Sequence, residues 1–479
     1  MRLEECIKQR LVVLTDISNE PDDEQSLVRL LVYATDVDIE GLVATTSVHL
    51  KGKVRPDLIQ RQLEAYRQIL PNLQKHHSGY PEADSLLNLV GGGPTGQGMK
   101  GVGDDFDTDG SDLVITSVDR DDPRPVWVTL WGGANCLAQA LWKVRRTRSE
   151  SEVDTFVKKI RVYAISDQDD AAMWIRETFP GLYYVVSPKP YNLSTWYGVK
   201  GVGDVPGADD SKIELSALRS PRREELDGII DPDHPGTKWV IANIRTGHGP
   251  LGDLYPETKY AMEGDTPSYL GLFQNGLNFW ENPKHGGWGG RYELYKPGHD
   301  YADFYEKRYP ENHYAGETRP IWTDVNDTYL GIDDNMHTDN RGTVARWRDD
   351  FQDDFAVRMD WCITSDFKDA NHNPIAAFRG QAGKETVHLD ATPGDSIGLS
   401  AEGSSDPDGD DLQFTWTYYK EAGTFADDIT IEDASAITTT LQIPTNAWGT
   451  EIHILLTVKD NGDPPMRSYR RIIIHIADS

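Results

Sequence analysis

The chain has 479 residues, of which 38% are hydrophobic, and it contains 13 Trp, 21 Tyr and 12 Phe. This length and apolar content predict two or three packed domains and argue against wholesale disorder. The formal net charge of −30 argues against a nucleic-acid polymer as partner, because phosphates would be repelled. We therefore expect a carbohydrate or another small molecule as the ligand.

No stretch of the sequence approaches the roughly 20 apolar residues that a membrane span needs. The first six residues lack the apolar core of a signal peptide, so we expect a soluble protein, cytoplasmic unless a leader has been removed, and secreted in that case. Cys6, Cys136 and Cys362 are widely separated, which favours free thiols and leaves one disulfide open. The sequence leaves open whether the protein forms a homo-oligomer.

An acidic segment over residues 15–24 is the most informative feature of the sequence. It follows the apolar, strand-like stretch Leu11–Leu14 and precedes helically spaced apolar residues over 25–33, and residues 39–45 have the pattern of a second strand. Strand, polar turn, helix and strand predict a βαβ unit in a parallel sheet. Ligands of such sheets bind beyond the carboxyl ends of the strands, where this turn lies.

Carboxylates crowded into one turn repel one another unless a cation or protons neutralise them. Ca²⁺ prefers about six to eight oxygen ligands. Asp16, Asp22 and Asp23 can supply several of these from a single loop. The alternative is a solvated, N-capped turn, because Asp and Asn are common before helices and favour the positive end of the helix dipole.

Strands and helices are predicted to alternate as far as residue 190. An amphipathic helix is expected over 56–70. A glycine-rich stretch follows at 91–98, which we interpret as a flexible loop and candidate lid, since no clear strand leads into it and a Walker-type ending is missing. The later elements are strands at 125–130, 160–165, 183–186 and 239–242 and helices at 136–144 and 171–178.

A second acidic cluster, Glu263-Gly264-Asp265, precedes a short helix. Asp265 before Pro267 fits a helix N-cap, and the functional alternative is another acidic ligand for the same pocket. A helix is predicted over 343–355, and short alternating segments beyond residue 371 predict a β-sandwich. The expected fold is an α/β domain over 1–370, a mostly parallel sheet with flanking helices, followed by an Ig-like β-sandwich domain over 371–479.

Four motifs occur in order along the chain: Asn19–Ser26, Trp131–Asn135, Ile165–Asp169 and Glu263–Ser268. Together they resemble the nucleoside hydrolase superfamily, and more closely its cellulose-binding, nucleoside-hydrolase-like members, in which a C-terminal β-sandwich also follows. The resemblance implies an active-site Ca²⁺ at the strand ends. The ligands that it implies are Asp16, Asp23, the backbone carbonyl of Ala134 and Asp265, with Asn135, Asp167 and Gln168 lining the pocket.

The implied chemistry is hydrolysis of a furanosyl or related glycosidic bond through an oxocarbenium-like state. A bound Ca²⁺ orients water and lowers its pKa while a carboxylate takes the proton, and we assign that base to Asp16, with Asp22 as second choice. Ser18 stands where the superfamily usually carries a second Asp, and Gly264 where a His often assists the leaving group. The candidate substitutes for that His are Glu263, His49 and His248.

The favoured interpretation is therefore a Ca²⁺-dependent glycosyl hydrolase, acting for example in polysaccharide degradation. One alternative is a carbohydrate-binding, cellulose-binding protein without turnover, which Ser18 and Gly264 support. Another is a nucleoside N-ribohydrolase, which needs a different acid. The concentration of aspartates favours turnover, because binding a neutral sugar needs no such charge.

Overall fold

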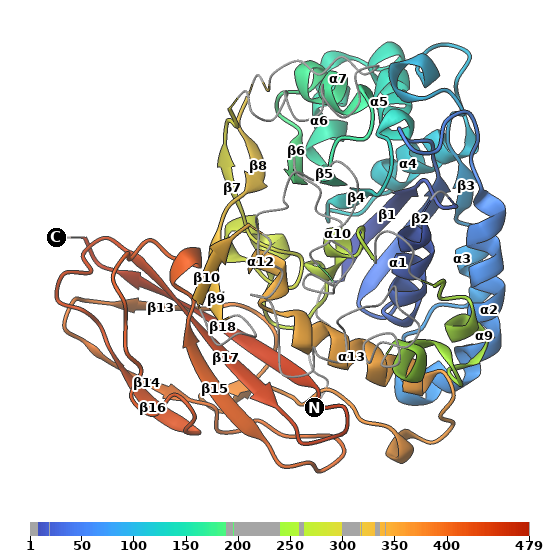
Figure 1. Cartoon of the computed structure of the whole chain (residues 1–479). Coiled ribbons are helices and arrows are strands. Elements are labelled where there is room, and N and C mark those ends of the chain that lie inside the picture. The colour runs from blue at the N-terminus through green and yellow to red at the C-terminus, as the bar shows by residue number, and fades with distance from the viewer. Residues whose placement is uncertain are drawn as a thin grey trace.

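The computed structural model describes residues 8–18, 20–187, 195, 240–257, 263–298, 317, 319–330, 336–340 and 342–478. Its main feature is an eight-stranded sheet of order β3-β2-β1-β4-β5-β6-β8-β7 (Figure 1). Neighbouring strands run parallel as far as β8, and β7 pairs with β8 antiparallel at the edge. The strands are β1 Gln9–Thr15, β2 Val37–Ala44, β3 Val90–Gly92, β4 Val126–Leu130, β5 Ile160–Ile165, β6 Tyr183–Ser187, β7 Tyr292–Tyr295 and β8 Ile321–Asp324.

Helices cover both faces of this sheet, which explains why the central strands β1 and β4 are buried along their whole length. Side chains alternate between the faces: Leu11 and Val13 of β1 join one apolar cluster, and Val12 and Leu14 join the other. The first cluster includes residues of α1, α2 and α13, and the second includes residues of α4, α5, α6 and α7. The helices are α1 Pro21–Val32, α2 Pro56–His76, α3 Ala83–Leu87, α4 Asp109–Asp119, α5 Asn135–Thr147, α6 Glu150–Lys158, α7 Ala171–Thr178, α9 Gly249–Asp253, α10 Pro267–Leu270, α12 Gly342–Ala345 and α13 Arg348–Trp361, and the short helical turns are η1 Gly98–Gly101, η4 Ile241–Arg245, η5 Phe279–Glu281, η6 Pro283–His285, η7 Phe367–Asp369 and η8 Lys420–Ala422.

The strand order reverses direction between β1 and β4. From β1 the chain adds β2 and β3 on one side and then returns to place β4 on the other side of β1. In open parallel sheets, the crevice at such a switch point, beyond the carboxyl ends of the strands, is where ligands bind. The turns after β1 and β4 carry Asp16 and the segment Trp131–Asn135.

Beyond α13 the chain forms a β-sandwich (Figure 1). Its larger sheet has the order β13-β18-β17-β15, and β14 pairs with β16. Met466 and Tyr469 of this part belong to the same buried cluster as Phe351 and Phe355 of α13, so the sandwich packs firmly on the α/β part. The remaining strands are β9 Asp327–Leu330, β10 Met336–Asp339, β11 Ala377–Phe378, β12 Gln381–Ala382, β13 Val387–Ala391, β14 Ser396–Ser400, β15 Gln413–Tyr418, β16 Thr438–Gln442, β17 Glu451–Lys459 and β18 Arg467–Ile476.

The fold class is confirmed, whereas the division at residues 370 and 371 stays a prediction. The glycine-rich stretch is not wholly a loop, because Gly91 and Gly92 lie in β3. A Cβ added to Gly91 would lie 3.2 Å from the Cα of Gly110 in α4, so glycine here allows a helix to pack closely rather than a lid to move. The strand expected at 239–242 is also wrong in its described part, since the π-helix η4 begins at Ile241. A short apolar run does not distinguish strand from helix.

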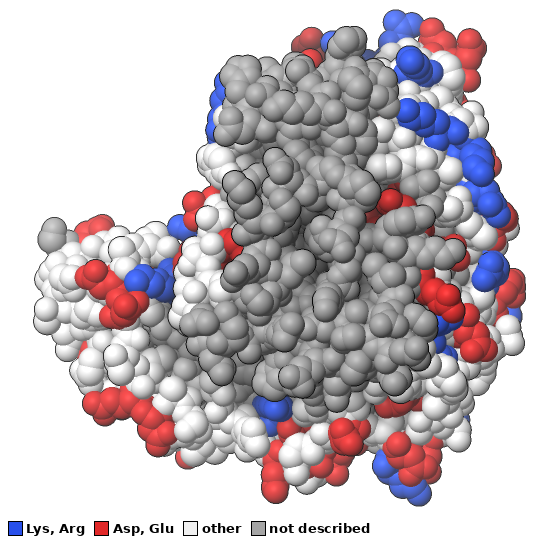
Figure 2. Space-filling view, in the orientation of Figure 1, with Lys and Arg blue, Asp and Glu red and all other residues white. Residues whose placement is uncertain are grey.

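The helix expected over 343–355 is divided between α12 and α13. Cys136 and Cys362 are buried free thiols, and Cys6 lies outside the described residues. Within the described part of the chain, none of the helices has the length and apolar character that a membrane crossing requires. On the face shown in Figure 2, acidic and basic side chains are interspersed over the described surface.

Candidate metal centre

Aspartates from three chain segments meet beyond the carboxyl end of β1. Asp16 directly follows β1, Asp22 and Asp23 stand in the first turn of α1, and Asp265 stands two residues before α10. One carboxylate oxygen from each of Asp22, Asp23 and Asp265 lies within 4.8 Å of the others. All of these aspartates are buried, with exposed fractions of 3–5%. The structure thus brings together residues that are more than 240 positions apart in the sequence.

Burial and mutual repulsion disfavour the charged forms of these carboxylates. Burial raises the pKa of Asp16 to about 7, and burial together with neighbouring carboxylates raises the pKa values of Asp22, Asp23 and Asp265 well above their usual range. The negative charge of the half-buried Glu20 adds to these shifts. A cation at this place would offset the repulsion.

Two carboxylate oxygens in the cluster are buried without a hydrogen-bond partner among the described residues, Asp22 Oδ1 and Asp265 Oδ2. Buried acceptors that lack a partner are costly and rare. The donor set consists of carboxylate oxygens alone, which suits a hard divalent cation such as Ca²⁺ or Mg²⁺ better than a thiophilic metal. The residues present therefore fit a metal ion.

Neighbouring hydroxyl groups orient two of the aspartates. Thr15 Oγ1 donates a hydrogen bond to Asp23, and Ser47 Oγ, beyond the end of β2, donates one to Asp16. Gly132, in the turn after β4, leaves room for the carboxylate of Asp16, since a Cβ added there would lie 2.6 Å from Asp16 Oδ1. The turns after β1, β2 and β4 therefore shape the site together.

Asp265 is positioned by an ion pair two residues earlier. Arg29 of α1 binds Glu263 through Nε–Oε2 at 2.5 Å and Nη2–Oε1 at 3.0 Å, with both side chains fully buried. Trp131 Nε1 donates to Ser268 Oγ at 2.9 Å and fixes the other side of the segment. The segment that carries Asp265 is thereby clamped between α1 and the turn after β4.

Glu263, a predicted catalytic residue, lies in a buried hydrogen-bond network. Besides the two contacts from Arg29, its carboxylate accepts hydrogen bonds from Tyr255 OH at 2.7 Å and from Thr266 Oγ1 at 2.9 Å. These contacts occupy both carboxylate oxygens, and the catalytic role of Glu263 stays a prediction. Sequence reasoning missed the contacts from Arg29 because Arg29 lies 234 residues away along the chain.

The predicted pocket-lining residues are largely engaged in supporting the strand-end turns. Asn135 is fully buried and its Nδ2 donates to Thr46 Oγ1, Pro94 O and Gly96 O at 2.8–3.0 Å, while its Oδ1 has no partner among the described residues. Asp167 is buried in a two-pronged ion pair with Arg176, at 2.9 and 2.7 Å. Both oxygens of Asp167 thus bind Arg176, and its role as a contact for substrate stays a prediction.

Gln168 and Ala134 are held by backbone contacts. Gln168 Nε2 donates to the carbonyl of Trp131 at 2.5 Å, which links the turns after β5 and β4. The carbonyl of Ala134 accepts from Ala138 N at 2.9 Å in the first turn of α5. A carbonyl oxygen has a second lone pair, so the role of Ala134 as a metal ligand stays a prediction.

The two histidine candidates lie in different surroundings. His49 is exposed, and its backbone N–H donates at 2.9 Å to Ser47 Oγ, the hydroxyl group that itself donates to Asp16. His248 is buried, with Nε2 3.0 Å from Asp360 Oδ1 in α13. No hydrogen bond or ion pair among the described residues joins His248 to the aspartates, and its role in the site stays a prediction.

Sequence reasoning missed Asp169, which is fully buried at the end of β5. Burial raises its pKa to about 7 despite hydrogen bonds from the backbone N–H groups of Ala134, Ala171 and Asn135. Its Oδ2 lies against the turn after β4, because a Cβ added to Gly133 would lie 2.2 Å from it. The acidic turn over 166–170 carried the signal, but its spacing did not show which aspartate faces inward.

Comparisons with known proteins bear on both parts of the chain. A family model described as "Cellulose-binding Sde182, nucleoside hydrolase-like domain" matches residues 10–292, and one described as "Cellulose-binding protein Sde0182, C-terminal domain" matches residues 396–476. A search among curated proteins gave no significant match.

A solved structure, described as a nucleoside hydrolase-related hypothetical protein from Saccharophagus degradans that is associated with carbohydrate metabolism, is 36% identical. The similarity covers 98% of this chain and 100% of that chain, with a TM-score of 0.79. The PKD domain from the KIAA 1837 protein is 21% identical over 20% of this chain and 83% of that chain, and its TM-score of 0.15 carries no argument. The chain therefore belongs to the cellulose-binding, nucleoside hydrolase-like Sde182 family.

Proposed function

We propose that this protein is a Ca²⁺-dependent glycosyl hydrolase that cleaves a furanosyl or related glycosidic bond. The observation that carries the proposal is the buried aspartate cluster with two unpaired oxygens, placed at the switch point of a parallel sheet. Binding a neutral sugar alone would not require several buried charges in one place. The membership of a carbohydrate-associated family supports a saccharide as substrate.

Within this proposal, Asp22, Asp23 and Asp265 hold the ion and Asp16 accepts the proton of the attacking water. Asp16 suits this task because Ser47 occupies one of its oxygens and Asp16 is absent from the tight group formed by the other three. The ion, when bound, would lower the pKa of water and chelate the sugar diol. Glu263 takes no part in proton transfer in this proposal. The leaving group is then protonated by His49, or departs without an acid from the protein.

A carbohydrate-binding protein without turnover is the second candidate. Two observations favour it: the family model is named cellulose-binding, and Glu263, a predicted acid, is fully committed to Arg29. In this case the ion would serve structure or saccharide binding only.

Thermal unfolding tests the metal site. We expect EGTA to lower the melting temperature of the wild type and Ca²⁺ to restore it, since an ion that binds only the folded state stabilises it. Asp265→Asn should abolish the response to Ca²⁺, yet melt no lower than the wild type in EGTA because one repelling charge is gone. Asp57→Asn, at an exposed position of α2, is the matched control and should respond like the wild type. Equal shifts of the melting temperature in all three proteins would refute the proposal that Ca²⁺ binds at the aspartate cluster.

Turnover is tested with aryl furanosides and nucleosides on the wild type, Asp16→Asn and Asp57→Asn. Release of the leaving group by the wild type and Asp57→Asn, but not by Asp16→Asn, would support the hydrolase. Equal background from all three proteins, together with retention on cellulose, would favour the binding protein. Release from nucleosides alone would identify a nucleoside N-ribohydrolase.

A further inference from the structure

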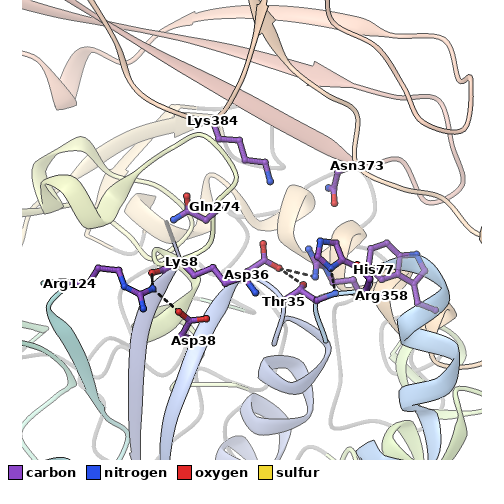
Figure 3. A pocket seen from close by; sticks show the side chains of 13 residues that line it. Lys8, Thr35, Asp36, Asp38, His77, Arg124, Gln274, Arg358, Asn373 and Lys384 are labelled. Carbon is purple, nitrogen blue, oxygen red and sulfur yellow. Dashed lines mark hydrogen bonds and ion pairs between the residues drawn. The ribbon is translucent and has the colours of Figure 1, made fainter. Parts of the chain in front are cut away.

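A cavity lies at the amino ends of the central strands, opposite to the end of the sheet that carries the aspartates. It has a volume of about 680 Å³ and opens where the amino ends of β1 and β2 meet the sandwich (Figure 3). Lys8 precedes β1, Asp38 belongs to β2, and Lys384 comes from the segment between β12 and β13. In Figure 3, Lys384 reaches in from the sandwich side, whereas Lys8 lies on the α/β side.

The lining of this cavity is cationic in a protein of net charge −30. Its two carboxylates are ion-paired, Asp36 with Arg358 at 3.0 Å and Asp38 with Arg124 at 2.6 Å. Each of these arginines also binds a carboxylate outside the lining, Asp354 or Asp122. The lining itself holds four cationic side chains and two carboxylates, and Lys8 and Lys384 have no ion-pair partner among the described residues.

The cavity also presents hydrogen-bond donors. Gln274 is only 6% exposed, and its Nε2 is buried without a hydrogen-bond partner among the described residues. His77 Nδ1 accepts a hydrogen bond from the backbone N–H of Gly79 at 3.0 Å, so the proton of the neutral ring is on Nε2. Burial lowers the pKa of His77, the negative charge of Asp36 raises it, and the charges of Arg358, Lys8 and Lys384 lower it.

We propose that this cavity binds a small, multiply charged oxyanion, carried by a polycarboxylate or a phosphorylated metabolite. Lys8 and Lys384 would bind its anionic oxygens from the two sides, and Gln274 Nε2 would supply a neutral hydrogen bond. An apolar ligand would leave the lysines and the amide desolvated without partners. Because the two lysines belong to different parts of the fold, such a ligand would also tie the sandwich to the α/β part.

This site is independent of the aspartate cluster. Lys8 and Asp16 stand at opposite ends of β1, which corresponds to about 25 Å for an extended strand. An anion at one end and a cation at the other therefore occupy separate sites. Failure of either proposal leaves the other untouched.

Isothermal titration calorimetry of the full chain tests the proposal with succinate and with inorganic phosphate as probes. Ionic strength is held constant with sodium chloride, because added salt by itself screens the net charge of −30 and would change the measured binding without any specific contact. Succinate is used since it chelates Ca²⁺ weakly. The variants are Lys8→Gln/Lys384→Gln, the single Lys384→Gln, and Lys75→Gln at an exposed position of α2 outside the cavity as the matched control.

We expect the wild type and Lys75→Gln to bind equally well. Binding should weaken roughly tenfold for each of Lys8 and Lys384 that is replaced, since each charged hydrogen bond is worth about one power of ten or more. Lys384 is exposed, so the single variant keeps the fold even where the double variant does not. Tighter binding of succinate indicates a polycarboxylate, and tighter binding of phosphate a phosphorylated ligand. No binding of either probe at millimolar concentration, or equal binding to all variants, would overturn the proposal.

Discussion

The ion pair between Arg29 and Glu263 gives the sharpest test of how the fold positions the metal site. Arg29→Met keeps an unbranched, flexible side chain, shorter than that of arginine, and removes the charge. The structure shows what is lost: two contacts to Glu263, a hydrogen bond from Nη1 to Phe351 O at 3.0 Å and one from Nη2 to Gln352 Oε1 at 2.6 Å. Removing one partner of a buried pair typically costs about 3–5 kcal/mol. Both side chains are fully buried, so solvent does not screen the pair.

Hydrogen exchange of the segment 263–270, followed by mass spectrometry, measures this cost locally. A loss of about 3 kcal/mol raises the opening equilibrium roughly a hundredfold. The double variant Arg29→Met/Glu263→Gln should recover about 2 kcal/mol, because the neutral amide leaves no uncompensated charge and still accepts from Tyr255 and Thr266. Exchange within about threefold of the wild type in Arg29→Met would refute the view that this pair holds Asp265 in place.

Three further predictions concern the rest of the molecule. Burial lowers the pKa of His453 to about 4 from an ordinary 6.5, so the protein takes up a proton on unfolding at a pH between these values. The free energy of unfolding should therefore fall by about 3 kcal/mol as the pH drops through this window. Urea titrations at several pH values would measure this fall, which should be smaller in His453→Gln. Gly91→Ala should lower the melting temperature, because its Cβ would press on Gly110, with Gly181→Ala, which has open space, as control. A chain ending at residue 370 should bind a dye for exposed apolar surface, because Met466 and Tyr469 of the sandwich belong to the core cluster that α13 shares. Failure of the dye to bind would show that the α/β part buries its apolar surface without the sandwich.

Local patterns predicted much of the sheet but not the pairings made across it. The strand Ile160–Ile165 and the helix Ala171–Thr178 have the predicted bounds, since an apolar strand and an amphipathic helix leave distinct periodicities. Asp16, Asp22 and Asp23 were predicted as candidate ligands from their crowding in one turn, and Asp265 from a second acidic cluster and the family resemblance. The commitment of Glu263 to Arg29 could not be predicted, because it depends on packing between distant segments rather than on any local pattern.

The shared core between the sandwich and α13 has a mechanical consequence. A domain joined through a flexible linker can take many orientations relative to the rest of its chain. Here Arg467 Nη1 is 2.7 Å from Asp353 Oδ2, and Tyr469 OH is 2.5 Å from Asp350 Oδ2, so no such swivel separates the two bodies. A molecule anchored through its sandwich would present the aspartate crevice at one fixed height and angle.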